Sequence, residues 1–188
     1  MSQLSFRYAH PEDAQELLRI YGPYVKNTAI TFEYEIPTAS EFNKRVETTL
    51  KSYPYLVALS DGKIIGYAYG SQFHPRAAYA WSAEVSIYLD RKARGMGIGR
   101  TLYQHLEEVL KKQNILNLNA CIASSATESI YLTDASEKFH RAMGYQLVGR
   151  FHQCGYKFDQ WFDMIWMEKI IGMHSNTPPQ FIPFSQLK

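Results

Sequence analysis

A short run rich in glycine and arginine has the composition of an anion-binding loop. It consists of Arg94, Gly95, Met96, Gly97, Ile98, Gly99 and Arg100. Glycine has no Cβ, so the backbone N–H groups of such a loop can approach a ligand closely. The apolar periodicity that follows predicts a helix from about Gly99 to Lys112, whose free N–H groups and positive dipole end point to the same place. This arrangement favours a phosphate or pyrophosphate.

Three known phosphate loops can be compared with this run. A Walker loop ends in Gly-Lys-Ser/Thr, whereas Arg100 follows Gly99 here. A dinucleotide loop requires G-x-G-x-x-G and an acidic residue about twenty positions later, and residues 116–122 contain no acid. The pattern Arg94-x-x-Gly97-x-Gly99 resembles instead the acetyl-CoA pyrophosphate loop of the GNAT superfamily of N-acetyltransferases. The alternative is a helix start without a ligand, although each glycine there costs roughly 0.5–1 kcal/mol relative to alanine.

Bulk composition restricts the class of protein. The 188 residues are 46% hydrophobic and 20% charged, as in an ordinary globular domain. A net charge of +2, concentrated around residues 91–100, fits a small anionic ligand better than a nucleic acid. The 14 tyrosines and 10 phenylalanines predict either an aromatic core or an aromatic-walled pocket or subunit interface.

Metal binding and membrane insertion are not expected. The six histidines and two cysteines show no metal-ligand spacing. Cys121 lies in an apolar run and is expected to be buried. The N-terminus has no signal-peptide core, and no apolar run is long enough to span a bilayer, so a cytoplasmic location is expected.

The periodicity predicts one α/β domain over residues 1–171, with a C-terminal tail over 172–188 that is extended or poorly ordered. Strands are expected at 4–9, 55–59, 64–72, 81–89, 117–123, 145–154 and 161–171. Helices are expected at 11–25, 39–50, 99–112 and 134–143. Gly22-Pro23 predicts a break or kink near the end of the first helix, and Asp134 with Glu137 resembles a capping box. This order implies helices packed on a mixed sheet.

The resemblance extends well beyond the glycine loop. Over residues 5–170 the chain resembles the phosphinothricin and methionine sulfone N-acetyltransferase branch of the GNAT superfamily. The segments that support it are Thr31-Phe32-Glu33, Tyr53 to Ala58, Tyr79 to Glu84, Gly97 to Tyr103, Phe139 to Tyr145, and Gly155 to Lys157 with Trp161 and Asp163. The resemblance implies the GNAT fold, with a mostly antiparallel mixed sheet. It also implies acetyl-CoA as cosubstrate, small amino acids or analogues such as phosphinothricin and methionine sulfoximine as acceptors, and a homodimer.

Three departures from this branch affect the substrate more than the reaction. Thr133 stands where the family often has Asn, and His74-Pro75-Arg76 replaces a Lys-x-Arg pattern. Residues 124–132 resemble an insertion, in which Ser125 and Glu128 could cap an extra helical turn.

Glu84 is the candidate catalytic base. Acetyl transfer needs a neutral amine, so a base must remove a proton from the ammonium, directly or through water. Glu84 lies in the apolar stretch 81–89, where reduced solvation would raise the pKa of a carboxyl group. A surface glutamate on an edge strand fits the local sequence equally well, and the resemblance at Ala83-Glu84 favours catalysis.

The same stretch and the late helix could hold the cosubstrate. Backbone groups of Ile87, Tyr88 and Leu89 could pair with the pantetheine amides and stabilise the thioester oxyanion, although an ordinary core strand is the alternative. His140 stands where many acetyltransferases have a tyrosine that protonates the leaving thiolate. Near neutral pH a histidine can donate or accept, so the resemblance implies a catalytic or substrate-orienting role. Ser136 could bind the cofactor or simply cap the helix.

Acceptor recognition is predicted for three residues. Arg76 could pair with an α-carboxylate, and Phe32 and Tyr79 could form the side-chain pocket. The expected activity is direct acetyl transfer to a small amino acid or analogue in a ternary complex. The alternatives are an enzyme for peptide N-termini or polyamines, and a non-catalytic CoA-binding module.

Overall fold

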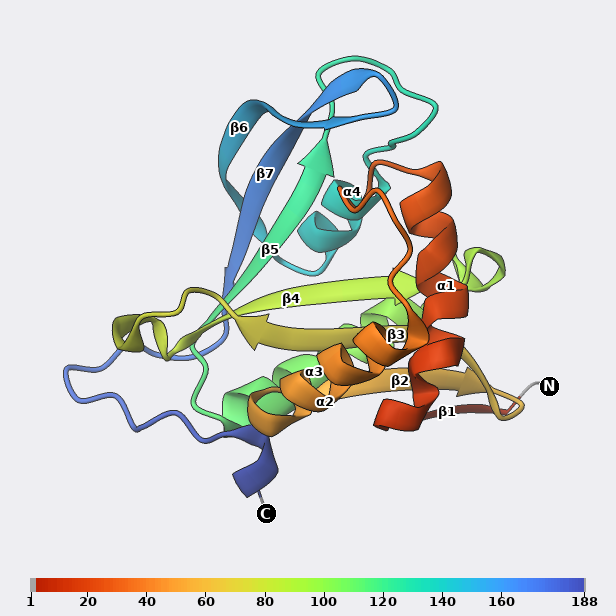
Figure 1. Ribbon diagram of the computed structural model, residues 1–188. Helices are drawn as coiled ribbons and strands as arrows, with labels where there is room; N and C mark the ends of the chain where they lie inside the picture. Colours follow the sequence, from red (N-terminus) through yellow and green to blue (C-terminus); the bar gives the residue numbers. More distant parts are fainter. Residues whose placement is uncertain (1–2, 188) are drawn as a thin grey trace.

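A computed structural model describes residues 3–187 and contains a seven-stranded sheet in the order β1-β2-β3-β4-β5-β7-β6 (Figure 1). The strands are β1 (Leu4–Tyr8), β2 (Tyr55–Ser60), β3 (Lys63–Gln72), β4 (Ser82–Leu89), β5 (Asn117–Ser124), β6 (Gln146–Lys157) and β7 (Gln160–Ile170). All neighbours pair antiparallel except β4 and β5. The expected α/β class and mostly antiparallel sheet are confirmed.

Two helical layers cover the sheet. Helices α1 (Ala14–Asn27) and α2 (Ala39–Ser52) pack on one face, and α3 (Ile98–Lys112) packs on the other beside α4 (Ala135–Ala142). Successive residues of a strand point to opposite faces. In β4, Ala83, Val85 and Ile87 therefore contact the α3 side, whereas Tyr88 packs on the α1–α2 side.

The sheet opens between β4 and β5. The two strands pair in parallel only where Ser82–Glu84 meets Asn117–Asn119, and beyond this point they diverge (Figure 1). On this edge of β4, residues 85–89 have no β-strand partner among residues 3–187. The fork leaves backbone groups of residues 85–88 on this edge available to an extended ligand, whereas the carbonyl of Leu89 accepts from the hydroxyl of Tyr24.

The C-terminal tail is extended and held against the domain. The indole of Trp81 donates to the carbonyl of Pro179 at 2.6 Å, and the amide of Gln113 donates to the carbonyl of Ile182 at 2.8 Å. Phe181 packs against the ring of Tyr53. The tail therefore lies in an extended conformation against the end of α3.

Four local expectations were wrong. Helix α1 continues through Pro23 to Asn27 without a break, because only one N–H is lost there. The carboxylate of Glu137 binds Arg141 at 2.8 Å and forms no capping box with Asp134. Ser125 starts a turn by accepting from the N–H of Thr127 at 3.3 Å, and no helical turn forms. Cys121 is exposed, because its side of β5 faces the opening of the sheet.

Candidate active site

The glycine loop adopts the conformation that its glycines permit. Gly95 and Gly97 have φ values of +78° and +77°, in the left-handed region that other residues rarely adopt. A Cβ built on Gly97 would meet no protein atom within 4 Å, so the space beside the backbone is open. Helix α3 begins at Ile98, directly after Gly97. The loop therefore presents bare backbone and a helix N-terminus to one space, as a phosphate requires.

At position 99 a glycine is needed for close packing and not for its backbone conformation. Its Cβ would lie 3.3 Å from the ring of Phe139 and 3.4 Å from the side chains of Ile87 and Leu89. Gly99 thus allows α3 to pack closely on β4 and α4, and it does not widen the ligand space. The side chain of Ile98 is buried in the core, so only its backbone can contact a ligand, while Met96 is 62% exposed.

A hollow of about 280 Å³ leads from the glycine loop to the end of β4 and the start of α4. It contains five of the residues predicted to bind the cofactor, namely Ile87, Leu89, Arg94, Gly95 and Ser136. The Arg94 guanidinium donates to the hydroxyl of Tyr24 at 3.1 Å, and this hydroxyl donates to the carbonyl of Leu89 at 2.6 Å. Tyr24 thus holds a cation at the loop, a role that the sequence pattern of an amphipathic helix did not indicate.

Glu84 lies at the fork between β4 and β5. It pairs with Ser71 of β3 on one side and Asn119 of β5 on the other, so it is not on an edge strand. Burial raises the pKa of the Glu84 carboxyl group. Neither a lysine nor an arginine within residues 3–187 forms an ion pair with Glu84. A half-buried carboxylate without a counter-ion is suited to take up a proton.

A narrow hollow of about 50 Å³ passes between β4 and β5 and is lined by Cys121, Tyr103 and His140. Cys121 is partly open to solvent, yet burial is still sufficient to raise the pKa of its thiol to about 12, so the thiol stays protonated at neutral pH. By strand alternation Glu84 and Cys121 lie on the α1–α2 side, whereas His140 approaches from α4. Candidate base and histidine therefore flank the opening from opposite faces.

His140 is buried and fully engaged. Its Nδ1 lies 2.8 Å from the carbonyl oxygen of Ser136, which can only accept, so Nδ1 carries the hydrogen. Its Nε2 lies 3.0 Å from the hydroxyl of Tyr103. Burial lowers the pKa of His140, so the ring is neutral and Nε2 accepts from Tyr103. Donation by Nε2 to a leaving thiolate would require a second proton on the ring, which burial disfavours. Tyr103 was missed because it belongs to the apolar stripe of α3.

The three residues predicted to bind the acceptor are not brought together. Arg76 and Tyr79 line a shallow, exposed hollow of about 370 Å³ with His74 and Pro75. Phe32 lies elsewhere, so close to Gly155 that a Cβ there would reach its ring.

The loop that carries Phe32 is held by Lys157, whose role no sequence pattern indicates. Its ammonium donates to the carbonyl oxygens of Val25, Thr28 and Thr31 at 2.7, 2.9 and 2.8 Å. Three carbonyl acceptors satisfy all three N–H groups of the ammonium. Lys157 therefore fixes the α1–α2 connection to the β6–β7 hairpin.

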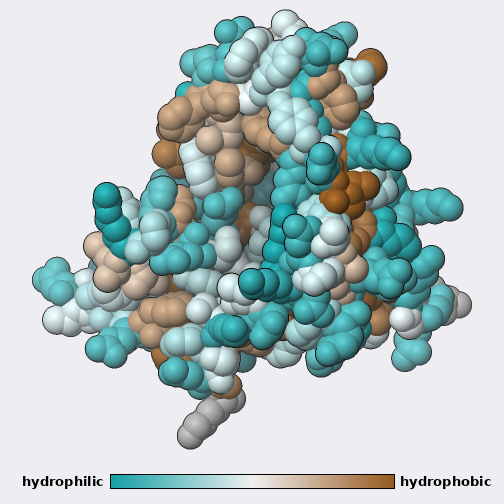
Figure 2. Space-filling model, viewed as in Figure 1, coloured by the Kyte–Doolittle hydropathy of each residue, from teal (hydrophilic) through white to brown (hydrophobic). Residues whose placement is uncertain are grey.

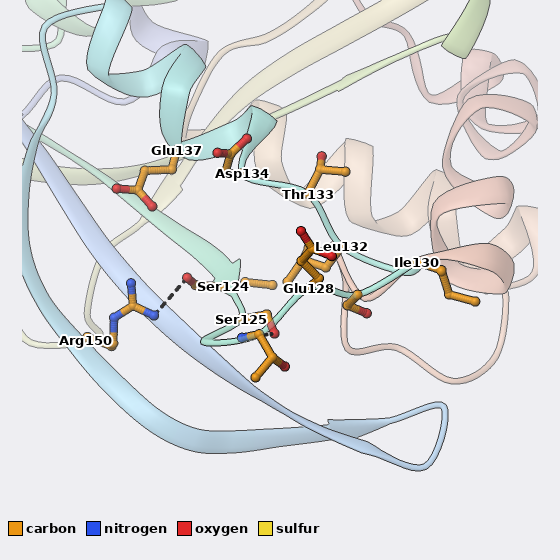
Figure 3. A pocket seen from close by; sticks show the side chains of 12 residues that line it. Ser124, Ser125, Glu128, Ile130, Leu132, Thr133, Asp134, Glu137 and Arg150 are labelled. Atoms are coloured by element: carbon orange, nitrogen blue, oxygen red, sulfur yellow. Dashed lines mark hydrogen bonds between the residues drawn. The ribbon is translucent and has the colours of Figure 1, made fainter.

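Residues 124–132 wall a separate hollow of about 740 Å³ at the end of β5 (Figure 3). Arg150 of β6 projects into it and donates to the hydroxyl of Ser124 at 3.1 Å, with Glu137 of α4 on the opposite side (Figure 3). Neither Glu84 nor the glycine loop lines this hollow. The insertion thus borders α4, and its last residue, Leu132, also lines the hollow between β4 and β5.

Comparison with known proteins agrees with this geometry. A family model described as acetyltransferase (GNAT) domain matches residues 6–166. The chain belongs to the GNAT acetyltransferase family. It is 31% identical to the phosphinothricin N-acetyltransferase of Alcaligenes faecalis, over 93% of this chain and 86% of the relative. It is 34% identical to the L-methionine sulfoximine/L-methionine sulfone acetyltransferase of Pseudomonas aeruginosa, over 93% and 98%.

A solved GNAT structure shows the same architecture. The GNAT phosphinothricin acetyltransferase of Sinorhizobium meliloti, in complex with acetyl-CoA, has a TM-score of 0.86 and 33% identity, covering 97% of each chain. The protein is an acetyl-CoA-dependent N-acetyltransferase. The open space beside Gly97 and the unpaired edge of β4 fit the diphosphate and the amide-bearing arm of this cosubstrate.

Two further features of this GNAT enzyme concern membranes and metal ions. Within residues 3–187 no helix is both long and apolar enough to cross a bilayer. In the same range, no group of three or more His, Cys, Asp or Glu side chains could hold a metal ion.

Proposed function

We propose that this GNAT enzyme acetylates the α-amine of small amino acids or analogues, of the type of phosphinothricin, methionine sulfoximine or methionine sulfone, by direct transfer in a ternary complex. The observation that supports this most is the position of Glu84, which lies without a counter-ion at the fork beside the free edge of β4. The printed activities of the relatives support the acceptor class.

Acetyl-CoA would bind along the fork. In this proposal the N–H groups of residues 95–100 hold the diphosphate, with Arg94 and Arg100 adding positive charge. The backbone of Ile87, Tyr88 and Leu89 pairs with the pantetheine amides, and Ser136 borders the same hollow. These contacts place the thioester between Glu84 and Tyr103.

The reaction then needs one proton acceptor and one site of charge stabilisation. Glu84 removes a proton from the ammonium, directly or through water, and the neutral nitrogen attacks the thioester carbonyl carbon. Negative charge develops on the carbonyl oxygen, where a free N–H of β4 stabilises it. The C–S bond breaks and the CoA thiolate leaves; the new amide nitrogen gives its second proton to this thiolate, so that the products are the amide and CoA thiol, and Glu84 returns its proton to solvent. A catalytic or orienting role for His140 stays a prediction. The one acceptor nitrogen of its neutral ring, Nε2, already accepts a hydrogen bond from Tyr103.

The acceptor class can be tested by thiol release. We expect turnover with methionine sulfone, methionine sulfoximine and phosphinothricin, and little with spermidine, because Arg76 favours a carboxylate over a polycation. Arg76→Ala is expected to raise KM for these acceptors about tenfold, the effect of losing one charge-assisted hydrogen bond. Lys138→Ala, which alters an exposed pair with Asp134 on α4, is the control. Turnover of spermidine or of peptide N-termini alone would reject the proposal.

We further propose that the protein forms a homodimer through β6. This strand is at the edge of the sheet, and apolar residues gather over β6 and β7 (Figure 2). Val148 is 59% exposed and Phe151 55%. An apolar edge strand is a site for pairing with a second chain. Sedimentation velocity should give twice the chain mass, and Val148→Lys should shift the protein to monomer. A wild-type monomer at micromolar concentration would exclude the dimer.

A single domain over residues 1–171 and a cytoplasmic location stay predictions.

A further inference from the structure

A tyrosine of α1 joins the end of β4 to the glycine loop. Tyr24 is 4% exposed, and its ring packs edge-on against Tyr88 with ring centres 5.2 Å apart. Its hydroxyl contacts Leu89, the last residue of β4, and Arg94, the first residue of the glycine loop. These three residues all line the hollow of about 280 Å³ in which the cosubstrate is proposed to lie. Tyr24 therefore connects three elements at this hollow.

Both backbone groups of Leu89 that face the fork are bound by Tyr24. The hydroxyl donates to the carbonyl of Leu89 at 2.6 Å and accepts from its N–H at 3.4 Å. The N–H of Asp90 donates to β3, and backbone groups alternate between the two sides of a strand, so the groups of Tyr88 also face β3. Of the three residues proposed to pair with the pantetheine arm, Ile87 alone has backbone groups that face the fork without a partner in the described part of the chain. The geometry thus narrows the proposed pairing to Ile87.

The same hydroxyl holds the charged group of Arg94. The guanidinium donates to it at 3.1 Å, and the guanidinium carbon lies 5.4 Å from the centre of the Tyr24 ring. One donated and two accepted bonds use the full capacity of a hydroxyl group, so its direction is fixed. Within residues 3–187, neither Arg94 nor Arg100 forms an ion pair with a carboxylate. Tyr24 is therefore the side chain that restrains Arg94.

A restrained cation binds an anion at a lower entropic cost than a mobile one. Arg94 is exposed, and without Tyr24 its long side chain would sample several rotamers. An arginine that becomes immobile only when the ligand binds loses this freedom at that moment, whereas Arg94 has lost it on folding. The hydroxyl is uncharged, so it leaves the positive charge of Arg94 unpaired and available to a phosphate.

From these contacts we infer that Tyr24 is a positioning residue for the cosubstrate: its hydroxyl, fixed by Leu89, holds the guanidinium of Arg94 where the diphosphate of acetyl-CoA binds. Tyr24 acts through Arg94 and does not touch the phosphates. The inference rests on the proposed function for the place of the diphosphate at residues 95–100.

Removal of the hydroxyl tests the inference. Tyr24→Phe keeps the ring and should weaken acetyl-CoA binding about three- to tenfold, the range for immobilising one long side chain. Calorimetric titration without an acceptor measures this affinity. At saturating acetyl-CoA, kcat should stay unchanged, because the thioester is held by the fork. S-acetylpantetheine has the thioester and the pantetheine arm but no diphosphate, so its kcat/KM should be the same in the variant and the wild type.

A second tyrosine of α1 is the matched control. The ring of Tyr21 also packs edge-on against Tyr88, with ring centres 5.0 Å apart, but its hydroxyl pairs with that of Thr31 at 2.8 Å. Tyr21→Phe therefore removes a buried hydroxyl from the same helix and the same aromatic contact without touching the glycine loop. Its affinity for acetyl-CoA should equal that of the wild type.

A double-mutant cycle separates the restraint from a general effect on the fold. Arg94→Ala should weaken acetyl-CoA binding, and Tyr24→Phe should add nothing in that background. A further loss there, or an equal loss for acetyl-CoA and S-acetylpantetheine, would overturn the inference. If Tyr24→Phe does not fold, Arg94→Ala and Arg100→Ala decide. A larger loss of affinity in Arg94→Ala supports a restrained cation, and equal losses reject it.

The outcomes also separate this inference from the proposed function. If Arg94→Ala weakens acetyl-CoA binding and Tyr24→Phe does not, the inference fails and the proposed place of the diphosphate stands. If Arg94→Ala leaves the affinity unchanged, the diphosphate lies elsewhere, and both fail. The choice of acceptor does not enter the titration, so a wrong acceptor class leaves this result intact.

Discussion

Replacing Glu84 by glutamine is expected to lower kcat by about 10²–10⁴-fold, the range for loss of a general base. Glutamine keeps the size of the side chain but cannot take up the ammonium proton. The affinity for acetyl-CoA should stay close to that of the wild type, because Glu84 lies on the α1–α2 side and the glycine loop lies at α3. Steady-state thiol release and equilibrium binding of acetyl-CoA measure the two quantities. Unchanged turnover would remove Glu84 from the reaction.

The pH dependence of the wild type should show the same group. Because burial raises the pKa of Glu84 above its usual value of 4.5, kcat/KM should fall with acidification at a pH above 4.5, and this limb should disappear in Glu84→Gln. The folded state binds its proton more tightly than the unfolded chain does. Glu84 therefore costs stability as the pH rises above 4.5, and the glutamine variant should be more stable than the wild type at pH 7.

A second buried carboxylate supplies the control. Glu107 of α3 binds the ammonium of Lys169 at 2.8 Å and takes no part in the fork. Glu107→Gln should leave turnover unchanged and lower the free energy of unfolding, because Lys169 loses its counter-ion. Opposite effects of two glutamate-to-glutamine changes on activity and stability would separate a functional carboxylate from a structural one.

The sequence predicted local structure well where a single residue type determines the backbone conformation. A glycine loop before a helix was predicted at residues 94–100, and Gly95 and Gly97 have positive φ directly before helix α3. Capping was less predictable, because one pattern can have two outcomes. Thr38 accepts from the N–H of Glu41 at 3.2 Å in a capping box, whereas Glu137 binds Arg141 instead. Both glutamates have an arginine one helical turn later, but Arg45 pairs with Glu33 at 2.8 Å, whereas Arg141 pairs with Glu137.

The parts of the site that depend on distant contacts could not be predicted from the sequence. Tyr103 looked like a core residue of α3, and only the packing of α4 places its hydroxyl against His140. Lys157 binds carbonyl oxygens more than a hundred residues earlier in the chain. Phe32 was predicted to form part of the acceptor pocket, and only the fold shows that its ring packs against Gly155. Motifs identify the residue types, and tertiary packing determines which of them meet.

Gly97→Val is expected to weaken acetyl-CoA binding by about 100-fold or more. The valine side chain would occupy the open space beside the loop, where the diphosphate is proposed to lie. Hydrogen bonds to a charged group contribute about 1.5–3 kcal/mol each, so loss of one or two of them accounts for this factor. Calorimetric titration with acetyl-CoA measures it. Wild-type affinity in the variant would show that the diphosphate binds elsewhere.

Backbone strain alone must be separated from this effect. Valine at a φ of +77° is strained, at a cost of order 1–3 kcal/mol in folding free energy. Gly62 in the β2–β3 turn has a φ of +78° and equally open surroundings, so Gly62→Val carries the same strain far from the fork. Both variants should lose similar stability, but only Gly97→Val should lose acetyl-CoA affinity. If Gly97→Val does not fold, Gly97→Ala serves instead, since alanine tolerates the left-handed region better and its Cβ still projects into the same space. Equal loss of affinity in both positions would attribute the effect to folding and not to the loop.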